Sequence, residues 1–540
     1  MGKRVLVIGA GIAGLSAASY LQRNGFDTEI FELHDKAGGL CTAWKRGGYT
    51  FDGCVHWLMG SGPSSNLHEI WRELGAGDLE YVEWDEYLRV RLSDGDSFVV
   101  YTDPARLEAE MLRLGPGDSR VARSVAAKVR LAASLDMPAA MDKLPLGERL
   151  ALLARLPAAL PLLPWARRSV ADLVAPVRSA KLREGFERLF GEAIGEFPAA
   201  ALFMMLGFMA KKSSGYPIGG SLAFAKAIEA KYLSLGGKVR YGARVDEIIV
   251  EDGKAVGLRG AWGEERGDYV VSAADGRDTL KRLLRGRYAH PELEASLAEE
   301  SDGAAEAGAT AAASAGADDG AALSSAPAPR KGAGRAKAKG QARLARYPSL
   351  IYVGLGLARD FSGTPHMQSF TLDQSLVLEG GALELKRLGL RLFTFDPTTA
   401  PEGKTAAIVM IETRNDAYWT GLRGSDRSAY EREKAETARK VVAALDRFVP
   451  GLAESVETVD VATPASFIRY TNNWHGSYEG WLPTGGSLGK RVSKTLPGLR
   501  NFHLVGQWTN PGGGLPPCGI GGRRLAQRLC KAEGLRFKAD

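Results

Sequence analysis

Cysteine and histidine are scarce in this sequence. Its 540 residues include four cysteines, at positions 41, 54, 518 and 530, and seven histidines. The cysteines are too scattered for a disulfide framework or a zinc ligand set, and the histidines form neither an HExxH motif nor a His/Cys ligand pattern. We therefore expect no metal site, and we expect a reducing compartment.

Long hydrophobic runs are also absent. Residues 150–165 are interrupted by Arg155 and three prolines, and the apolar run 199–210 is too short to cross a bilayer. No secretory leader precedes the first apolar run, Arg4–Ile8. We expect a cytoplasmic protein. Because the 150–165 stretch carries Trp165 and flanking arginines, it either dips into the inner face of a membrane as a peripheral anchor or forms a buried helix pair.

The net charge is concentrated in one segment. The formal charge is +7, and residues 330–346 alone hold seven Lys or Arg and no acid. The rest of the chain is balanced, so we expect no nucleic-acid partner. Residues 301–346 contain 18 Ala and 7 Gly but no aromatic residue. Such a segment cannot bury enough apolar surface to offset its backbone entropy, which predicts a disordered, low-complexity insertion.

A β-strand, a glycine turn, a helix and a second strand follow one another near the start of the sequence. Arg4–Ile8 leads into Gly9, Gly11 and Gly14 of a GxGxxG motif. The first glycine permits a tight turn, the second lets the backbone approach a pyrophosphate, and the third allows close packing of helix on strand. Glu32, at the end of the second strand, can accept hydrogen bonds from ribose hydroxyls. The pattern predicts a dinucleotide site with a helix N-terminus facing the phosphates.

A second glycine pair selects FAD as the expected dinucleotide. Gly38–Gly39 follows six residues after Glu32 and indicates that the backbone passes close to the cofactor a second time. No motif supplies a flavin attachment residue, so we expect noncovalent FAD. A second dinucleotide pattern at Gly354–Gly356 fails because Arg359 stands where the third glycine belongs. NAD(P) is therefore expected only as a diffusible reductant.

These motifs and several further along the chain resemble the FAD-dependent phytoene desaturases, carotenoid isomerases and retinol saturases, within the wider flavin amine-oxidase-like group. The similarity spans residues 3–530 apart from the 301–346 insertion. The matching segments are Val7–Leu15, Glu32, Gly38–Gly39, Gly48–Gly53, Val270–Asp275 with Thr279, Leu504–Trp508 and Pro511–Pro516.

The resemblance implies where the rest of the cofactor binds. A glycine-rich turn before the last helix would aim N–H groups at the O2 side of the isoalloxazine, although a plain closing loop is the alternative. Val245 matches the position that holds adenine through its backbone. The cofactor-binding residues that we predict are Gly9, Gly11, Ile12, Ala13, Gly14, Glu32, Leu33, Gly39, Leu40, Val245, Ala274, Gly506, Gly514, Leu515 and Pro516.

The resemblance also suggests two catalytic candidates, His56 and His475. His56 should lie beside the flavin, where its imidazole can exchange a proton with a substrate carbon or simply hydrogen-bond the flavin. A histidine at this place is more similar to the retinol saturase branch than to the phytoene desaturase branch. His475 belongs to a stretch near the substrate end of the flavin. Trp57, Trp508 and Arg469 are expected along the substrate tunnel, although the two tryptophans equally suit ordinary packing.

The predicted fold class is α/β, with a doubly wound, Rossmann-type FAD-binding domain and a mixed-sheet substrate domain that carries a helical insertion. A last helix is expected over Arg523–Ala532. We expect the FAD-binding domain to comprise residues 1–75, 214–285 and 498–535. We expect the substrate domain over residues 76–213, which carry its helical, membrane-facing insertion, and over residues 347–497. The low-complexity insertion is expected over residues 301–346.

The expected activity is FAD-dependent oxidoreduction at carbon–carbon bonds of a hydrophobic small molecule of the polyene or isoprenoid kind. Desaturation, saturation and isomerisation would use the same flavin and tunnel, and the sequence does not choose among them. Two alternatives stay open. An amine- or porphyrinogen-oxidase-type enzyme would have a narrower polar or aromatic pocket, and a non-catalytic, flavin-containing lipid-binding protein would show no turnover.

Overall fold

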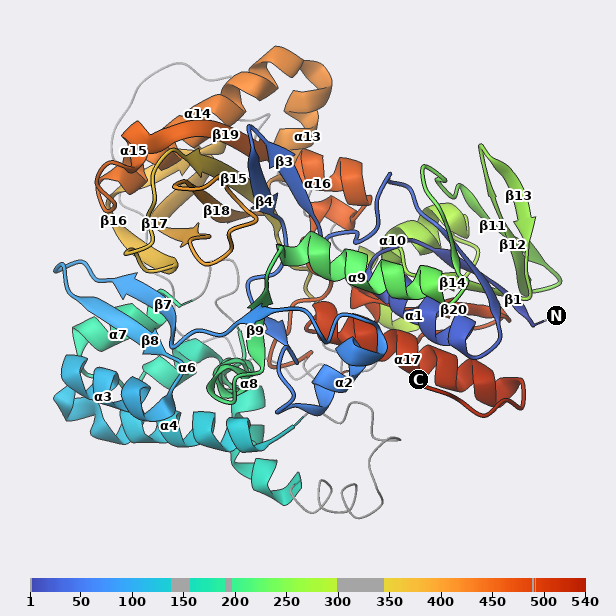
Figure 1. The fold of residues 1–540 in the computed structure, drawn as a ribbon, viewed down its shortest axis with the longest axis horizontal. Helices are drawn as coiled ribbons and strands as arrows, with labels where there is room; N and C mark the ends of the chain where they lie inside the picture. The colour runs from blue at the N-terminus through green and yellow to red at the C-terminus, as the bar shows by residue number, and fades with distance from the viewer. Residues whose placement is uncertain (1, 137–155, 190–196, 299–343, 488–489, 491) are drawn as a thin grey trace, which may run out of the picture.

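A sheet of five parallel strands forms one half of the molecule (Figure 1). The computed structural model describes residues 2–136, 156–189, 197–298, 344–487, 490 and 492–540. The strand order is β10-β2-β1-β14-β20, which is 3-2-1-4-5 in chain order and is typical of a doubly wound dinucleotide-binding fold. The strands are β1 (Arg4–Ile8), β2 (Asp27–Phe31), β10 (Lys238–Arg240), β14 (Tyr269–Ser272) and β20 (Phe502–Leu504).

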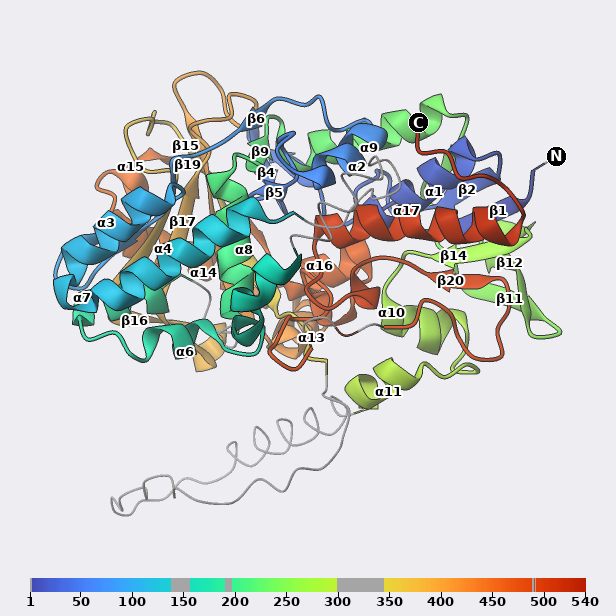
Figure 2. The same cartoon turned by 90° about the horizontal axis from the view of Figure 1, so that it is seen from below.

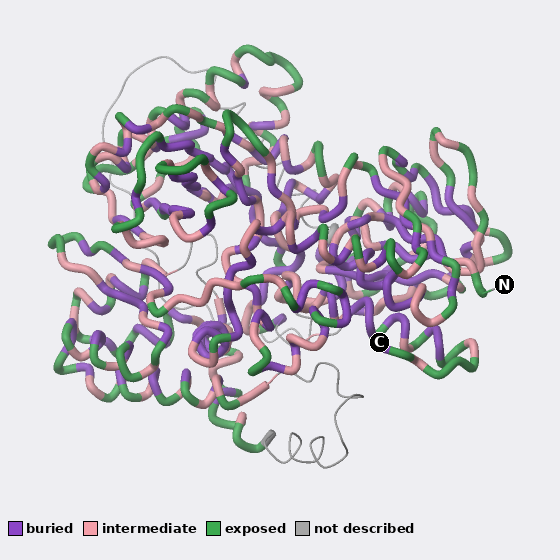
Figure 3. Tube along the Cα trace, in the orientation of Figure 1, coloured by how far each residue is buried: buried purple, intermediate pink, exposed green. Residues whose placement is uncertain are grey.

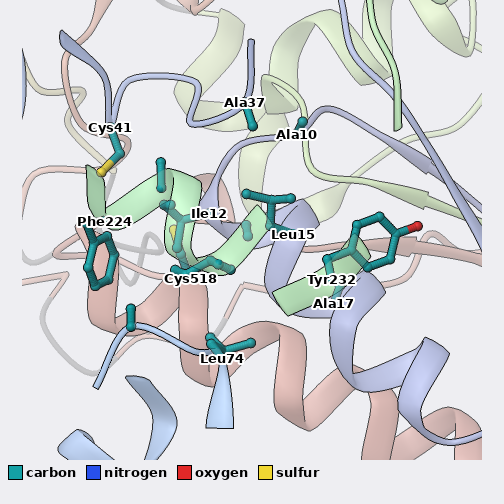
Figure 4. Close-up of a cluster of buried hydrophobic side chains, with 14 of the residues drawn as sticks. Ala10, Ile12, Leu15, Ala17, Ala37, Cys41, Leu74, Phe224, Tyr232 and Cys518 are labelled. Atoms are coloured by element: carbon teal, nitrogen blue, oxygen red, sulfur yellow. The ribbon is translucent and has the colours of Figure 1, made fainter. Parts of the chain in front are cut away.

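Three helices pack together against this sheet: α1 (Ile12–Arg23), α9 (Gly220–Ser234) and α17 (Leu515–Ala532). The helices α1 and α17 lie side by side in both views (Figures 1 and 2). Figure 4 shows the shared core, where Leu15 of α1, Phe224 of α9 and Cys518 of α17 contribute side chains. The apolar βαβ pattern at the start of the sequence therefore becomes the centre of this half.

The last helix begins at Leu515, eight residues before the start that we predicted from the sequence. Three glycines and two prolines made residues 515–522 look non-helical, since both residue types disfavour helix interiors. The prolines lie in the first turn, where no intrahelical N–H is needed. Gly519 and Gly522 lie where an added Cβ would meet Trp71 and Ser16 at 2.9 and 2.4 Å. Close packing of α17 explains this local conflict with helix propensity.

A mixed seven-stranded sheet forms the second half, in the order β19-β15-β18-β17-β16-β7-β8. Neighbouring strands are antiparallel except β16 and β7, which pair in parallel. The strands are β7 (Glu86–Arg91), β8 (Ser97–Tyr101), β15 (Ser349–Leu357), β16 (Met367–Leu378), β17 (Leu383–Leu392), β18 (Thr405–Thr413) and β19 (Val456–Ala462). One face packs on α13 (Asp416–Ser425), α14 (Arg427–Asp446), α15 (Leu452–Ser455) and α16 (Pro464–Thr471).

A cluster of helices from residues 104–210 covers the other end of this half (Figure 1). Its elements are α3 (Pro104–Leu114), α4 (Ser119–Ser134), the 3-10 helix η2 (Leu156–Ala166), α6 (Val170–Val174), α7 (Ala180–Glu187) and α8 (Ala199–Ala210). Figure 3 shows α8 buried along most of its length, whereas α3 and α4 keep an exposed side. Within the described residues, we find no helix that is both long and apolar enough to cross a bilayer.

Smaller elements connect the two halves. The hairpin β3 (Ala43–Arg46) and β4 (Tyr49–Asp52) packs under the seven-stranded sheet, and β9 (Ser214–Pro217) pairs with β5 (Leu58–Met59) and β6 (Tyr81–Val82). The other described α-helices and strands are α2 (Asn66–Glu73), β11 (Glu247–Glu251), β12 (Lys254–Gly260), β13 (Gly263–Arg266), α10 (Gly276–Asp278) and α11 (Pro291–Ala298). These observations confirm the predicted α/β fold class.

The predicted insertion 301–346 ends too late by three residues. Leu344 and Arg346 are buried, and the Leu344 N–H donates a hydrogen bond to Ser296 Oγ over 3.2 Å. The rest of the insertion lies outside the described residues, as do Arg155 and the apolar stretch before it. Val245, which the resemblance matches to the adenine position, lies just before β11.

Candidate functional site

One cavity of about 1200 Å³ extends from the five-stranded sheet to the seven-stranded sheet. At the first sheet it is lined by residues that directly follow β1, β2 and β14. The carboxyl ends of parallel strands meet there, and this edge is where open α/β sheets bind ligands. At the second sheet the lining comes from β16, β17 and β18, with α8 alongside. A ligand bound at the first sheet can therefore face one bound at the second.

The first glycine turn presents the N-terminus of α1 to the cavity. Gly9 follows β1, and Gly11 is the N-cap of α1 with no side-chain hydrogen bond at the cap. A Cβ on Gly14 would lie 1.9 Å from the Gly9 carbonyl oxygen, so only glycine allows this packing. The structure therefore gives Gly14 a packing position rather than a place in the cavity wall. The N–H groups of Ile12 and Ala13 are available to an anion such as a phosphate.

Glu32 is held rigidly at the end of β2. Its side chain accepts hydrogen bonds from the backbone N–H groups of Ala10, over 2.6 Å, and His34, over 2.8 Å. Burial raises the pKa of this carboxyl group above its usual value, and the two N–H donors act in the opposite direction. The carboxylate lines the cavity and keeps lone pairs for further donors, which fits the predicted contact with ribose hydroxyls.

The second glycine pair lies against the first turn. Gly38 N–H donates to the Ala10 carbonyl oxygen over 2.9 Å, and a Cβ on Gly39 would lie 3.3 Å from Gly11 Cα. The pair therefore brings two backbone segments together, in addition to lining the cavity. The sequence interpretation assigned this close approach to the cofactor alone.

A third backbone segment reaches the cavity from residues 506–515. This segment contains Gly514, the N-cap of α17, and the cap has no side-chain hydrogen bond. Pro516 and Pro517 lack an N–H, so Gly514 and Leu515 carry the backbone donors at this helix start. Pro516 lines the cavity as predicted for a cofactor contact, although it has no N–H to donate.

The remaining predicted cofactor residues also reach this cavity. Val245 lies at its wall, and the Val245 carbonyl oxygen accepts a hydrogen bond from Arg282 Nη1 over 2.9 Å. The others that line the cavity are Leu33, Leu40, Ala274 and Gly506.

The end of the cavity at the seven-stranded sheet is an apolar arm, which is defined by Trp57, Tyr87, Met204, Met205, Met367, Leu383, Leu385 and Met410. Trp57 packs edge-on against Tyr87, with ring centroids 5.8 Å apart. Trp508 lines the cavity as well, but it is only 5% exposed and packs against Trp481. Both tryptophans thus serve as wall and as packing.

His56 lies in the cavity wall as a neutral imidazole. Burial, together with the neighbouring Arg391 cation, lowers the pKa of His56 to about 3. The imidazolium form that would protonate a substrate is therefore absent near neutral pH. This narrows the predicted role of His56 to a hydrogen-bonding group or a weak proton acceptor.

Two predicted site residues do not line the cavity. His475 Nδ1 lies 2.7 Å from Asp416 Oδ2, in a hydrogen bond that turns the ring toward α13. Arg469, on α16, packs its guanidinium over the Tyr470 ring, 5.1 Å from the centroid. We correct both predictions, because similarity to a family segment placed the backbone near the flavin but did not determine where these side chains point.

The cavity residues that were missed from the sequence include Arg391 on β17 and Glu479. Arg391 is 4% exposed and interrupts the apolar run Leu388–Phe393. A charged residue within such a run is a signal that could have been noticed. Burial raises the pKa of Glu479 to about 7. Its sequence neighbourhood of aromatic residues and glycines gives little indication of that burial.

Three backbone segments rich in glycine, two helix starts without a side-chain cap and the buried carboxylate of Glu32 thus surround one end of the cavity. These residues fit a dinucleotide, with donors for its phosphates and an acceptor for its ribose. The arrangement defines a class of two-domain flavoproteins in which a mixed sheet faces the cofactor. A family model described as flavin containing amine oxidoreductase matches residues 12–306, and the chain belongs to this family. It is an FAD-dependent oxidoreductase.

Relatives along the whole chain agree with this assignment. The chain is 27% identical to a neurosporene-forming phytoene desaturase of Rhodobacter capsulatus, over 97% of this chain and 94% of that enzyme. It is 25% identical to a chloroplastic prolycopene isomerase of Daucus carota, over 99% and 81%. The cyclohexylamine oxidase of Brevibacterium oxydans has the same fold, with a TM-score of 0.51 at 17% identity over 98% of this chain and 100% of that one. The resemblance to phytoene desaturases and carotenoid isomerases is confirmed.

Proposed function

We propose that this enzyme acts on carbon–carbon bonds of an apolar polyene or isoprenoid substrate, by desaturation, saturation or isomerisation. The observation that carries the proposal is the apolar arm, which is continuous with the dinucleotide end of the cavity. An extended apolar molecule in the arm would place one of its bonds beside the cofactor. The curated relatives named as phytoene desaturase and prolycopene isomerase support the same substrate class.

In this proposal the chain binds and orients both molecules. The N-termini of α1 and α17 donate N–H groups to the cofactor, Glu32 accepts from its ribose, and the apolar arm excludes water. Bound FAD would supply electron exchange with the substrate. We assign no bound NAD(P), which would enter only as a diffusible reductant.

Noncovalent FAD is supported by the state of Cys518 in the cavity wall. Burial raises the pKa of this thiol to about 12, so the nucleophilic thiolate is rare at neutral pH. Acid precipitation of the holoprotein should therefore release all of its flavin into the supernatant. Flavin that stays with the precipitated chain would contradict noncovalent binding.

The apolar lining of the arm, with four methionines, two leucines and two aromatic residues, favours a polyene over the amine or porphyrinogen alternatives. A protonated amine needs acceptors for its N–H groups, since a charge is costly to bury among apolar groups. A purely lipid-binding role differs from the proposal only in turnover, so turnover is the measurement that separates them.

The test uses a variant that fills the arm. A Cβ on Gly389 would meet only the Gln368 carbonyl oxygen, at 3.8 Å, so Gly389→Leu places a side chain in the cavity with little strain. Holoprotein is given phytoene or prolycopene in vesicles with a quinone acceptor, and products are separated by chromatography. We expect turnover in the wild type and a loss of about tenfold or more in Gly389→Leu.

The matched control is Gly363→Leu, at an exposed glycine with no atom within 4 Å of its added Cβ. It should keep wild-type turnover, and both variants should keep the flavin absorbance. Conversion of amines but of no polyene by the wild type would contradict the proposed substrate. Equal turnover in Gly389→Leu and wild type would contradict the role of the arm.

We further propose that the helix η2 touches the inner face of the cytoplasmic membrane, so that an insoluble substrate enters directly. Leu160 and Leu163 of η2 are 59% and 58% exposed, and Arg167 and Arg168 follow them as exposed residues. Trp165 of η2 packs edge-on against Phe203 of α8, whose neighbours Met204 and Met205 line the arm. The proposed contact surface is therefore adjacent to the arm.

Vesicle flotation tests this contact. The wild type should float with anionic vesicles at low salt, and the Leu160→Glu, Leu163→Glu double variant should stay at the bottom of the gradient. Leu233→Glu is the control, because Leu233 on α9 is also exposed, at 46%, but lies far along the chain in the other half. Flotation that survives the double variant, or that is absent in the wild type, would exclude η2 as the anchor.

A further inference from the structure

Arg391 is a buried cation in the cavity wall with hydrogen-bonding capacity left over. Its Nη2 donates to the His56 carbonyl oxygen over 2.9 Å. Its Nε and Nη1 are buried and have no hydrogen-bond partner among the residues that the structure describes. An arginine with two unused buried donors is unusual, because an unmade hydrogen bond of a buried charged group is costly.

Aromatic rings rather than carboxylates surround this guanidinium. Its Cζ lies 5.1 Å from the ring centroids of Tyr216 and Phe393, 5.5 Å from that of Trp84 and 5.6 Å from that of Phe395. These rings stabilise the cation and fix its plane, but they accept none of its N–H bonds in the way an oxygen does. The four rings therefore hold Arg391 in place but leave its Nε and Nη1 donors without an acceptor.

The carboxylate whose charge acts on Arg391 is Asp52, and it is already engaged. Asp52 accepts hydrogen bonds from the Ser221 N–H over 2.6 Å, the Tyr216 hydroxyl over 3.0 Å and the Cys54 N–H over 3.0 Å, as well as from Ser221 Oγ. Within the described part of the chain, Arg391 forms no ion pair within 4.0 Å. The positive charge is thus only partly balanced by the protein itself.

The position of Arg391 on β17 directs it toward the ligand. Leu388, Leu390 and Leu392 of this strand belong to the core on the helix-covered face of the sheet. Arg391 lies on the opposite face of the strand, where it pairs with Met367 of the arm and follows Gly389, whose missing side chain leaves room in front. An apolar molecule that lies along the arm would therefore reach Arg391 with one end.

We propose that Arg391 binds an anionic oxygen of the substrate, so that the preferred ligand is a polyene or isoprenoid that ends in a carboxylate rather than a pure hydrocarbon. A carboxylate supplies both the acceptor and the negative charge that this site lacks. The inference rests on the proposed function, since it names the substrate class for the same cavity.

The test compares ligands that share one polyene and differ in their end group. Holoprotein is titrated with all-trans-retinoic acid, its methyl ester and retinol, and binding is followed by tryptophan fluorescence. Wild type should bind the acid about tenfold or more tightly than the ester or the alcohol, as expected for one hydrogen-bonded charge pair. Arg391→Met should remove this preference, and Arg391→Lys should retain part of it.

Arg387→Met is the matched control, because Arg387 also lines the cavity from β17 but its Nη1 donates to the Glu187 carbonyl oxygen near the surface. It should keep the preference for the acid. FAD absorbance is recorded for every variant, so that a role of Arg391 toward the cofactor appears as flavin loss with unchanged ligand preference, which would overturn the inference. If Arg391→Met does not fold, the comparison of acid with ester in the wild type decides the question.

The two proposals fail in different ways. Equal binding of acid, ester and alcohol would overturn the role of Arg391 and leave the polyene function intact. Absence of binding by all three would contradict the proposed function itself.

Discussion

Glu479 is a carboxyl group held against backbone rather than beside a base. A Cβ on Gly513 would lie 2.8 Å from Glu479 Cγ, and one on Gly514 would lie 2.9 Å from Glu479 Oε1. Burial raises the pKa of Glu479 to about 7, while a hydrogen bond with the Tyr347 side chain acts in the opposite direction. The group therefore changes charge near neutral pH beside the backbone that leads into α17.

This carboxyl group should make stability depend on pH. Between about pH 4.5 and 7 the unfolded chain has released this proton and the folded chain retains it, so the free energy of unfolding falls as pH rises. Each unit of pKa difference corresponds to about 1.4 kcal/mol. Glu479→Gln should flatten this part of the profile of melting temperature against pH, measured on the holoprotein.

The control is Glu436→Gln on α14, whose carboxylate is solvent-exposed and paired with Arg439. It should leave the profile between pH 4.5 and 7 as it is in the wild type. A Glu479→Gln profile that runs parallel to the wild type would show that Glu479 titrates normally.

The residues of the nucleotide end could be predicted because their contacts are local. Gly9, Gly14 and Glu32 belong to one βαβ unit, whose geometry fixes their spacing. The charge of Arg391 within an apolar run is a local signal of burial, but the rings of Trp84 and Tyr216 that hold it lie far away in the sequence and cannot be read from that run. His475 was expected near the substrate end of the flavin and Arg469 along the tunnel, because their segment is similar to a family stretch, and their side-chain partners in this chain differ from that expectation.

At the scale of elements, the contact between α1 and α17 joins residues from the two ends of the sequence. Ser16 Oγ donates to the Gly519 carbonyl oxygen over 2.9 Å. A Cβ on Gly522 would lie 2.5 Å from the Ala17 backbone nitrogen, which cannot move without shifting α1. The helix that offers its N-terminus to a phosphate is therefore positioned by α17.

Gly522→Ala should destabilise the protein by about 1–3 kcal/mol through overpacking. Because the strain displaces α1, retention of FAD during gel filtration should fall as well. Gly421→Ala in α13 is the control, since no atom lies within 4 Å of its added Cβ, and it should gain up to about 1 kcal/mol from helix propensity. A Gly522→Ala protein with unchanged melting temperature and flavin content would show that the two helices can separate easily.

The start of α17 illustrates what propensity alone misses. Residues 515–522 contain helix-disfavouring prolines and glycines, and a local prediction therefore begins the helix at Arg523. Gly519 and Gly522 leave no room for a larger residue beside Trp71 and Ser16, and this close packing is visible only in the folded protein. The strand β1, by contrast, contains the continuous apolar run Val5–Ile8 buried in a parallel sheet, and such a run can be recognised from sequence.

At the scale of the whole molecule, the cavity exists only because distant segments meet. The nucleotide end is formed by residues near 9–39, 245, 274 and 506–515, and the apolar arm by residues near 57, 204 and 383–410. The α/β class and the flavin could be predicted, because each rests on a motif that is complete within a short segment. The volume and lining of the arm could not, because they depend on how β16, β17 and α8 pack against one another.

The chain on either side of residues 299–343 is fixed by contacts within the fold. Leu344 N–H donates to Ser296 Oγ over 3.2 Å, and Leu344 shares a core with Leu293 of α11. The two attachment points therefore lie close together, and a Gly-Ser-Gly-Ser linker is long enough to join Ala298 to Leu344. Shortening a loop lowers its closure cost by about 0.6 kcal/mol for each halving of length, so the melting temperature should be unchanged or slightly raised. FAD content should equal that of the wild type.

A second variant that also removes residues 344–346 should lose soluble protein, because Leu344 and Arg346 are buried. Loss of flavin or of solubility in the first variant would show that residues 299–343 take part in the fold.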